Sequence, residues 1–178
     1  MKDARSYNAL DTLRNGTPIV IRAVRADDRQ RIAQAFAGLE RESVYTRFFS
    51  IKPALSDAEL GQIDAMDFVR DVMLVVTVSA AGAQTVIASA RYIARDEADG
   101  SLTAEVAFTV EEDYQGNGIA GRLLGHLARI ARDNGIARLE ADVLPENGAM
   151  LAVFRKSGLP MNARRDGGVF HVTLALSG

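Results

Sequence analysis

The chain has 178 residues, of which 48% are hydrophobic and 25% are charged, so it is long enough to bury the core of one globular domain. Its formal net charge is −2, which argues against a protein built to bind nucleic acid. It contains no cysteine, which excludes disulfides, a cysteine nucleophile and zinc held by thiolates.

The start of the chain is polar and mixed in composition. We expect residues 1–16 to form a loosely held arm and residues 17–178 to form a single domain. The first residues lack the apolar core of a signal peptide, and no apolar run is long enough to cross a bilayer. We therefore expect a cytoplasmic protein that does not associate with a membrane.

The domain begins with one strand and then helices. Residues 17–24 alternate and are rich in β-branched side chains, which predicts a strand. Asp27 is a good cap for an amphipathic helix that continues to Leu39. A second short helix is expected over residues 43–49. The Ser-Asp-Ala-Glu sequence at 56–59 is a capping box and predicts the start of a third helix.

Three strand-like runs follow, over residues 72–80, 85–94 and 102–110. Their connectors are short, and short connectors join antiparallel neighbours. The later elements are a helix over residues 118–133, a strand over 137–144, a helix over 148–157 and a strand over 169–176. Asn147 is expected to cap the second of these helices, and Gly158 to end it. The sequence therefore predicts an α+β fold with a mixed, mostly antiparallel sheet flanked by helices.

A glycine-rich loop connects the third of these runs to the following helix. It contains a Gly-x-Gly-x-x-Gly pattern at Gly116, Gly118 and Gly121. Such a loop lets a ligand approach the backbone closely, and the helix N-terminus attracts anions. Glu140 in the next strand would suit a dinucleotide site, but three antiparallel strands before the loop argue against that fold. A glycine turn without any ligand remains the other interpretation.

Residues 115–120 also match the pattern Gln/Arg-x-x-Gly-x-Gly/Ala. On this pattern the chain resembles the GNAT acetyltransferase superfamily, in which the loop binds the pyrophosphate of coenzyme A. Asn147-x-x-Met150-Leu151, leading to residues 156–158, matches a second element of that superfamily. The resemblance covers residues 18–176 and implies a GNAT fold, with acetyl-CoA or coenzyme A as co-substrate and no metal.

The resemblance also implies which residues hold the donor. The end of the third strand is expected to pair its main chain with the pantetheine arm, because the next strand diverges there and leaves backbone groups free. A backbone N–H near Val110 is the expected oxyanion donor. The residues expected to bind the cofactor are Phe108, Thr109, Val110, Gln115, Gly116, Asn117, Gly118, Ile119, Ala120, Gly121 and Asn147.

Glu105 is the candidate general base for an amine that must lose a proton before it attacks. It lies inside a strongly apolar strand, so we expect it to be partly desolvated, which would raise its pKa. Lysine acetyltransferases of the superfamily often carry their base at this point. The alternative is that Glu105 faces solvent or pairs with Arg91. Phe154 occupies the position where many members carry a tyrosine acid, so the thiolate would leave unassisted or take a proton from solvent.

A closer resemblance points to an acceptor. Residues 43–60, 104–120 and 143–151 are similar to bacterial protein lysine acetyltransferases that inactivate acyl-CoA synthetases. This favours a protein lysine as acceptor and an acyl-CoA synthetase as partner. A small-molecule amine acetyltransferase and a non-catalytic module that senses acyl-CoA remain as alternatives.

Overall fold

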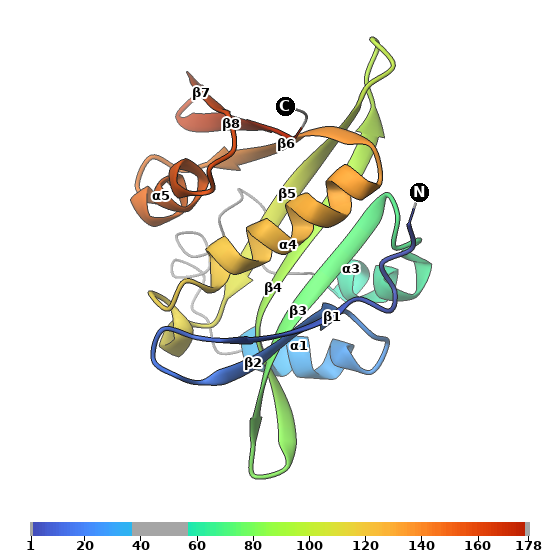
Figure 1. Cartoon of the computed structure of the whole chain (residues 1–178), viewed down its shortest axis with the longest axis vertical. Helices are drawn as coiled ribbons and strands as arrows, with labels where there is room; N and C mark the ends of the chain where they lie inside the picture. The colour runs from blue at the N-terminus through green and yellow to red at the C-terminus, as the bar shows by residue number, and fades with distance from the viewer. Residues whose placement is uncertain (1, 37–56, 177–178) are drawn as a thin grey trace.

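The computed structural model describes residues 2–36 and 57–176, and Figure 1 shows their arrangement. Within these ranges, eight strands form one sheet in the order β1-β2-β3-β4-β5-β6-β8-β7. The strands are β1 (Asn8–Thr12), β2 (Pro18–Ala23), β3 (Asp71–Ala80), β4 (Ala83–Asp96), β5 (Leu102–Val110), β6 (Ile136–Val143), β7 (Met161–Asp166) and β8 (Val169–Ala175). Neighbouring strands are antiparallel except β5 and β6, which are parallel. The predicted α+β class and mostly antiparallel sheet are confirmed.

Helices cover both faces of this sheet. They are α1 (Asp28–Phe36), α3 (Asp57–Gly61), α4 (Ile119–Asp133) and α5 (Gly148–Lys156), with short 3-10 turns η1 (Gln62–Ala65) and η2 (Glu112–Tyr114). Figure 1 shows α4 crossing one face over β4 and β5, with α1 and α3 behind the sheet. No helix in the described ranges is long and apolar enough to cross a bilayer. The short helix expected over residues 43–49 and the expected helix end at Leu39 lie outside the described residues.

The expectation of a loosely held arm over residues 1–16 is wrong. Residues 8–12 form β1, which pairs with β2 along its whole length. Ala4 and Leu13 are buried, and the Ala4 N–H donates to the Phe68 carbonyl at 2.8 Å. Main-chain hydrogen bonds hold this segment in place, and its polar composition gives no sign of them. Strand β7 was also not predicted, because its residues are almost all exposed and carry no alternating pattern.

The helix α4 packs a continuous apolar stripe on the sheet. The residues of this stripe are all buried: Ile119, Leu123, Leu124, Leu127, Ala128 and Ala131. Gly118 precedes the helix with a left-handed backbone, at φ +81°, which costs a glycine little. This glycine therefore allows β5 to turn through the loop and present the first turn of α4 at the end of the sheet.

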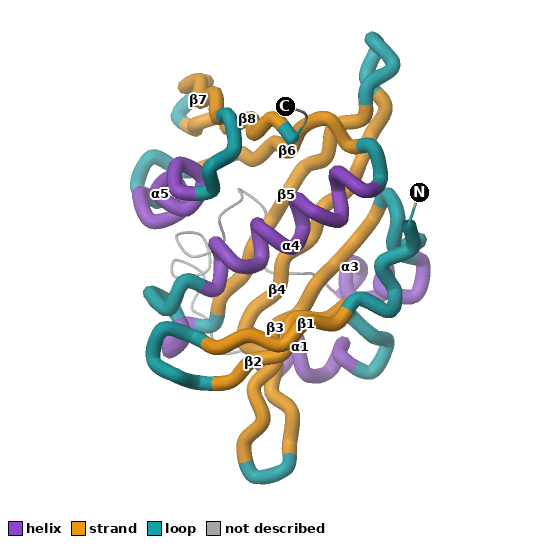
Figure 2. The backbone as a smooth tube through the Cα atoms, in the orientation of Figure 1, coloured by secondary structure: helices purple, strands orange, loops and turns teal. Residues whose placement is uncertain are grey.

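The strand β5 loses one of its two neighbours halfway along its length. It pairs with β4 from Leu102 to Val110, but its pairing with β6 ends at Glu105, opposite Glu140. Figure 2 shows β6 and β8 running in a different direction from β4 and β5. Within residues 2–36 and 57–176, the second half of β5 therefore has a free backbone edge beside the glycine loop.

Candidate active site

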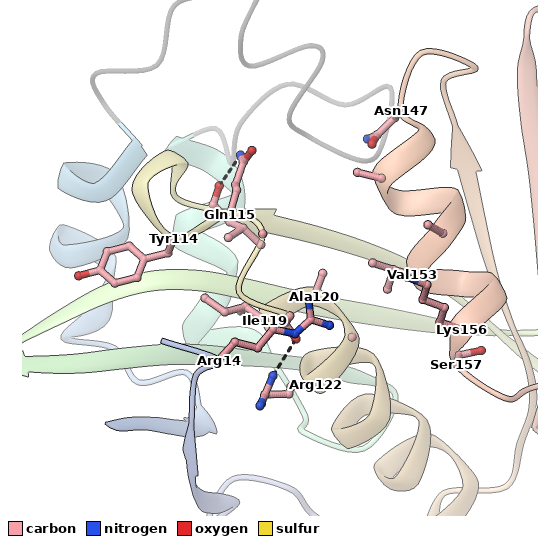
Figure 3. Close-up of a pocket in the computed structure, with 16 residues that line it drawn as sticks. Arg14, Tyr114, Gln115, Ile119, Ala120, Arg122, Asn147, Val153, Lys156 and Ser157 are labelled. Atoms are coloured by element: carbon pink, nitrogen blue, oxygen red, sulfur yellow. Dashed lines mark hydrogen bonds between the residues drawn. The ribbon is translucent and has the colours of Figure 1, made fainter. Parts of the chain in front are cut away.

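A cavity of about 620 Å³ lies between the glycine loop, the first turn of α4 and helix α5 (Figure 3). Most of the residues predicted to bind the donor line it: Val110, Gln115, Gly116, Gly118, Ile119, Ala120, Gly121 and Asn147. The other lining residues are Arg14, Tyr114, Arg122, Ala149, Ala152, Val153, Lys156 and Ser157. The cavity thus joins the loop and α5, which lie far apart in the sequence.

Three predicted contact residues turn their side chains elsewhere. Phe108 is buried and makes an edge-on contact with Phe154, with ring centroids 6.1 Å apart. Thr109 is buried on the other side of β5 from Phe108, as strand alternation requires. Asn117 donates from its amide to the Tyr114 carbonyl at 3.2 Å, so its side chain shapes the loop. None of these three side chains lines the cavity.

The glycine loop is held in a fixed shape around the helix N-terminus. Gly116 and Gly118 both have positive φ, +78° and +81°. Gln115 donates from its amide to the Val110 carbonyl at 3.3 Å, which ties the loop back to β5. The N–H groups of the first turn of α4 have no acceptor within the helix, and the helix dipole adds partial positive charge. The loop and helix together present donors suited to an anion.

The free edge of β5 carries main-chain donors. The Glu111 N–H donates to the Ile87 carbonyl of the β4 side at 2.8 Å. In an antiparallel pair the backbone groups alternate between the two edges. The N–H groups of Phe108 and Val110 therefore point to the opposite edge, where β6 has separated. Among the described residues, no strand pairs with β5 along this part of the edge, and the role of an oxyanion donor near Val110 stays a prediction.

Arg122 fastens the N-terminal hairpin to this site. Its Nε donates to Asp11 Oδ2 at 2.7 Å, and its Nη2 donates to the Thr12 carbonyl at 2.9 Å. Its Nη1 donates to the carbonyls of Asn117 and Gly118, both at 3.4 Å. The Arg122 side chain is 28% exposed, and its partners lie in a hairpin that is distant in the sequence.

Glu105 is exposed, so the alternative that it faces solvent is confirmed. It lies on the sheet face opposite α4, because the adjacent Val106 pairs with Tyr92, whose hydroxyl accepts a hydrogen bond from Asn134 at the end of α4. The expected desolvation is absent because Ala104 and Val106, which make the strand look apolar, point to the other face. The suggested pairing with Arg91 is also absent, since Arg91 donates to both carboxylate oxygens of Asp71, at 2.8 and 2.7 Å. Glu105 does not line the cavity, but it is the last residue of β5 to pair with β6.

Ionisable side chains of β6 and β8 lie in the part of the sheet next to Glu105. Glu140, its partner in register, accepts a hydrogen bond from Arg95 at 2.6 Å. His171 on β8 is hydrogen bonded through Nδ1 to Asp142 at 2.8 Å. The pairing register of the sheet brings these residues together, and that register cannot be predicted from any local sequence pattern.

The helix α5 forms the wall of the cavity facing the loop. Asn147 is buried and accepts a hydrogen bond from the Met150 N–H at 3.2 Å, so its predicted capping role is confirmed. Phe154 is fully buried against Phe108 and offers no proton to a leaving group. The Ser157 hydroxyl donates to the Phe154 carbonyl at 2.6 Å, which occupies its proton.

Comparisons with known proteins agree on one family. The sequence profile of the acetyltransferase (GNAT) family matches residues 41–159. Acetyltransferase Pat of Mycolicibacterium smegmatis is 34% identical over 146 residues, and the match covers 82% of this chain but only 42% of Pat. Acetyltransferase PA5475 of Pseudomonas aeruginosa is 30% identical over 141 residues, covering 79% of this chain and 74% of that protein.

A solved structure shows the same architecture. The crystal structure of the GNAT domain of S. lividans PAT superposes with a TM-score of 0.78 at 34% identity. The match covers 94% of this chain and 96% of that domain.

Proposed function

The chain belongs to the acetyltransferase (GNAT) family, which takes its acetyl group from acetyl-CoA, and we propose that it transfers that group to a lysine amine on a folded protein. The observation that carries the proposal is the open edge of β5 beside the glycine loop that leads into the N-terminus of α4. Together these features offer main-chain donors for the acyl end of the donor and backbone N–H groups for its phosphates. Both lie in or beside one cavity.

The carboxylate of Glu105 is proposed as the general base in a direct attack. A lysine ammonium has a pKa near 10.4 and no lone pair, so it must lose a proton before it attacks the thioester. Glu105 marks the point where β5 and β6 separate, on the sheet face opposite α4. An amine that approaches from that face would meet the carboxylate and the open edge of β5 together.

The leaving thiolate is proposed to depart without a protein acid. Phe154 is buried in the core at the position where the family often carries a tyrosine, and the Ser157 proton is held by a carbonyl. A thiol with a pKa near 8.5 is a fair leaving group. Protonation by solvent then completes the reaction, which yields an amide and free coenzyme A.

A protein acceptor is favoured by the likeness of residues 43–60, 104–120 and 143–151 to lysine acetyltransferases that modify acyl-CoA synthetases. This chain spans less than half the length of Pat. The proposal therefore concerns the catalytic domain itself. An acyl-CoA synthetase is the proposed partner, and its active-site lysine the proposed acceptor.

An acetylation assay tests the acceptor. The chain and acetyl-CoA are incubated with an intact acyl-CoA synthetase, with a short peptide spanning its active-site lysine, and with a panel of small amines. We expect intact synthetase to be modified at one lysine and the peptide to react far more slowly. Equal rates for peptide and protein would reject recognition of a folded partner.

Two other outcomes correspond to the remaining alternatives. Rapid turnover of a small amine, with no modification of either protein substrate, would replace the protein acceptor by a small molecule. Binding of acetyl-CoA without release of free thiol, whatever the acceptor, would indicate a sensing module. The sensing module stays an alternative because the buried Phe154 stands where the family often carries a tyrosine acid.

A further inference from the structure

The cavity beside the glycine loop is cationic. Three of its sixteen lining residues carry positive charge, Arg14, Arg122 and Lys156, and none carries negative charge. Arg122 is already bound to the Asp11 carboxylate and to backbone carbonyls. Its charge is therefore largely offset within the protein, and its donors are occupied.

Arg14 stands in the turn between β1 and β2, and the fold fixes its backbone. Leu13, next to it, is 3% exposed and its N–H donates to the Thr17 carbonyl at 2.9 Å. The Gly16 N–H donates back to the Leu13 carbonyl at 2.9 Å, and Gly16 has a φ of +86°. The Asp11–Arg122 ion pair then fastens this hairpin to the start of α4. The turn is thus held against the glycine loop.

The side chain of Arg14 reaches over the first turn of α4 (Figure 3). A Cβ atom placed on Gly118 would lie 3.4 Å from Arg14 Nε and 3.6 Å from Arg14 Cζ. Within residues 2–36 and 57–176, Arg122 makes an ion pair and side-chain hydrogen bonds, whereas Arg14 makes neither. The Arg14 guanidinium therefore stands beside the helix N-terminus with its donors available.

We propose that Arg14 binds a phosphate of the coenzyme A donor, so that the N-terminal hairpin completes the donor site. The inference rests on the proposed function, since it presumes that acetyl-CoA occupies this cavity. A guanidinium presents planar paired donors that match a phosphate, and it remains charged at any physiological pH. Arg122 acts as the positioning residue, because its bonds to Asp11 and Thr12 hold the turn in place.

Calorimetric titration of matched variants tests the inference. Acetyl-CoA and its 3′-dephospho form are titrated into the wild-type chain, Arg14→Gln and Arg165→Gln. Arg165 is exposed on β7 and does not line the cavity, so its replacement removes the same charge from a distant site. We expect Arg14→Gln to weaken acetyl-CoA binding roughly tenfold, the scale of one charge-assisted hydrogen bond at a partly exposed site. Arg165→Gln should stay within about twofold.

The second ligand identifies the phosphate. If the loss in Arg14→Gln is the same for both ligands, Arg14 contacts the pyrophosphate. If the loss disappears with the 3′-dephospho form, it contacts the 3′-phosphate. Affinity of Arg14→Gln for both ligands equal to that of Arg165→Gln would overturn the inference. Absence of binding to the wild-type chain would instead remove the donor site itself, and with it the proposed function.

Discussion

At the scale of single residues, Glu105 gives the sharpest test of the chemistry. Glu105→Gln should slow acetyl transfer by roughly a hundredfold to ten-thousandfold, the usual contribution of a general base. Its affinity for acetyl-CoA should not change, because Glu105 does not line the donor cavity. The deficit should shrink as pH rises, since the acceptor amine then loses its proton without help. Single-turnover rates between about pH 6.5 and 9.5 measure this.

Glu140→Gln is the matched control, because Glu140 lies beside Glu105 in register but is bound to Arg95. It should change the rate only a few-fold. A larger loss in Glu140→Gln than in Glu105→Gln would transfer the base role to Glu140.

Two glycines around α4 should respond to alanine in opposite ways. Gly118 has φ +81°, and a Cβ atom there would lie 2.8 Å from Arg122 Nη1. Gly118→Ala should therefore cost about 1 kcal/mol of stability and weaken acetyl-CoA binding at least about tenfold. Gly125 lies in the middle of α4 and is exposed, with nothing within 4 Å of such a Cβ. Gly125→Ala should therefore stabilise the folded chain by about 0.5–1 kcal/mol. Urea unfolding and calorimetry measure both effects, and equal stability of the two variants would contradict the strain argument.

At the scale of elements, a buried ion pair joins β2 to the start of α1. Arg22 is 2% exposed and Asp28 0% exposed, and they share two hydrogen bonds of 2.7 and 2.8 Å. Burial raises the pKa of Asp28, but hydrogen bonds from Arg22, the Arg25 N–H and Arg31 outweigh it and leave the pKa below its ordinary value. A carboxylate with a lowered pKa stabilises the fold above its unfolded pKa, near 3.9, and loses that contribution as pH falls further.

Asp28→Asn should therefore destabilise the chain by about 3–5 kcal/mol at pH 7, because it leaves the Arg22 charge buried without a partner. Its stability should also depend less on pH than that of the wild-type chain below about pH 4. Urea unfolding across pH 3 to 7 tests both points. A cost under about 1 kcal/mol at pH 7 would show that solvent reaches Arg22.

How far these elements could be predicted depended on what each one buries. The predicted strand over residues 102–110 matches β5, because its alternation reflects a buried face. Edge strands β1 and β7 escaped prediction because they bury little, so their residue order carries no period. The glycine loop was found from local chemistry, whereas Arg14 was missed because only the hairpin's packing brings it to the loop. The exposure of Glu105 was misjudged for a related reason: which face of a strand is covered is decided by other elements.

At the scale of the whole molecule, the donor should stabilise the fold by mass action. Acetyl-CoA at one hundred times its dissociation constant should add about 2.7 kcal/mol to the free energy of unfolding. For a chain of this size that corresponds to a rise in Tm of roughly 5–11 °C. Differential scanning calorimetry with and without the ligand measures the shift. An unchanged Tm at saturating acetyl-CoA would mean that the folded chain does not bind the donor.

The early end of the β5–β6 pairing divides the sheet into two unequal leaves. Strands β1 to β5 form one leaf and β6 to β8 the other. Among the residues that the structure describes, the strand pairing that joins them is four residue pairs long, from Leu102 to Glu105. A donor that hydrogen bonds to the free edge of β5 would take the place of a neighbouring strand where β6 has separated. Amide hydrogens of Phe108 and Val110 should then exchange with deuterium more slowly when acetyl-CoA is present. The ligand that the enzyme consumes would thus also bind its two leaves together, and each release of coenzyme A would loosen them again.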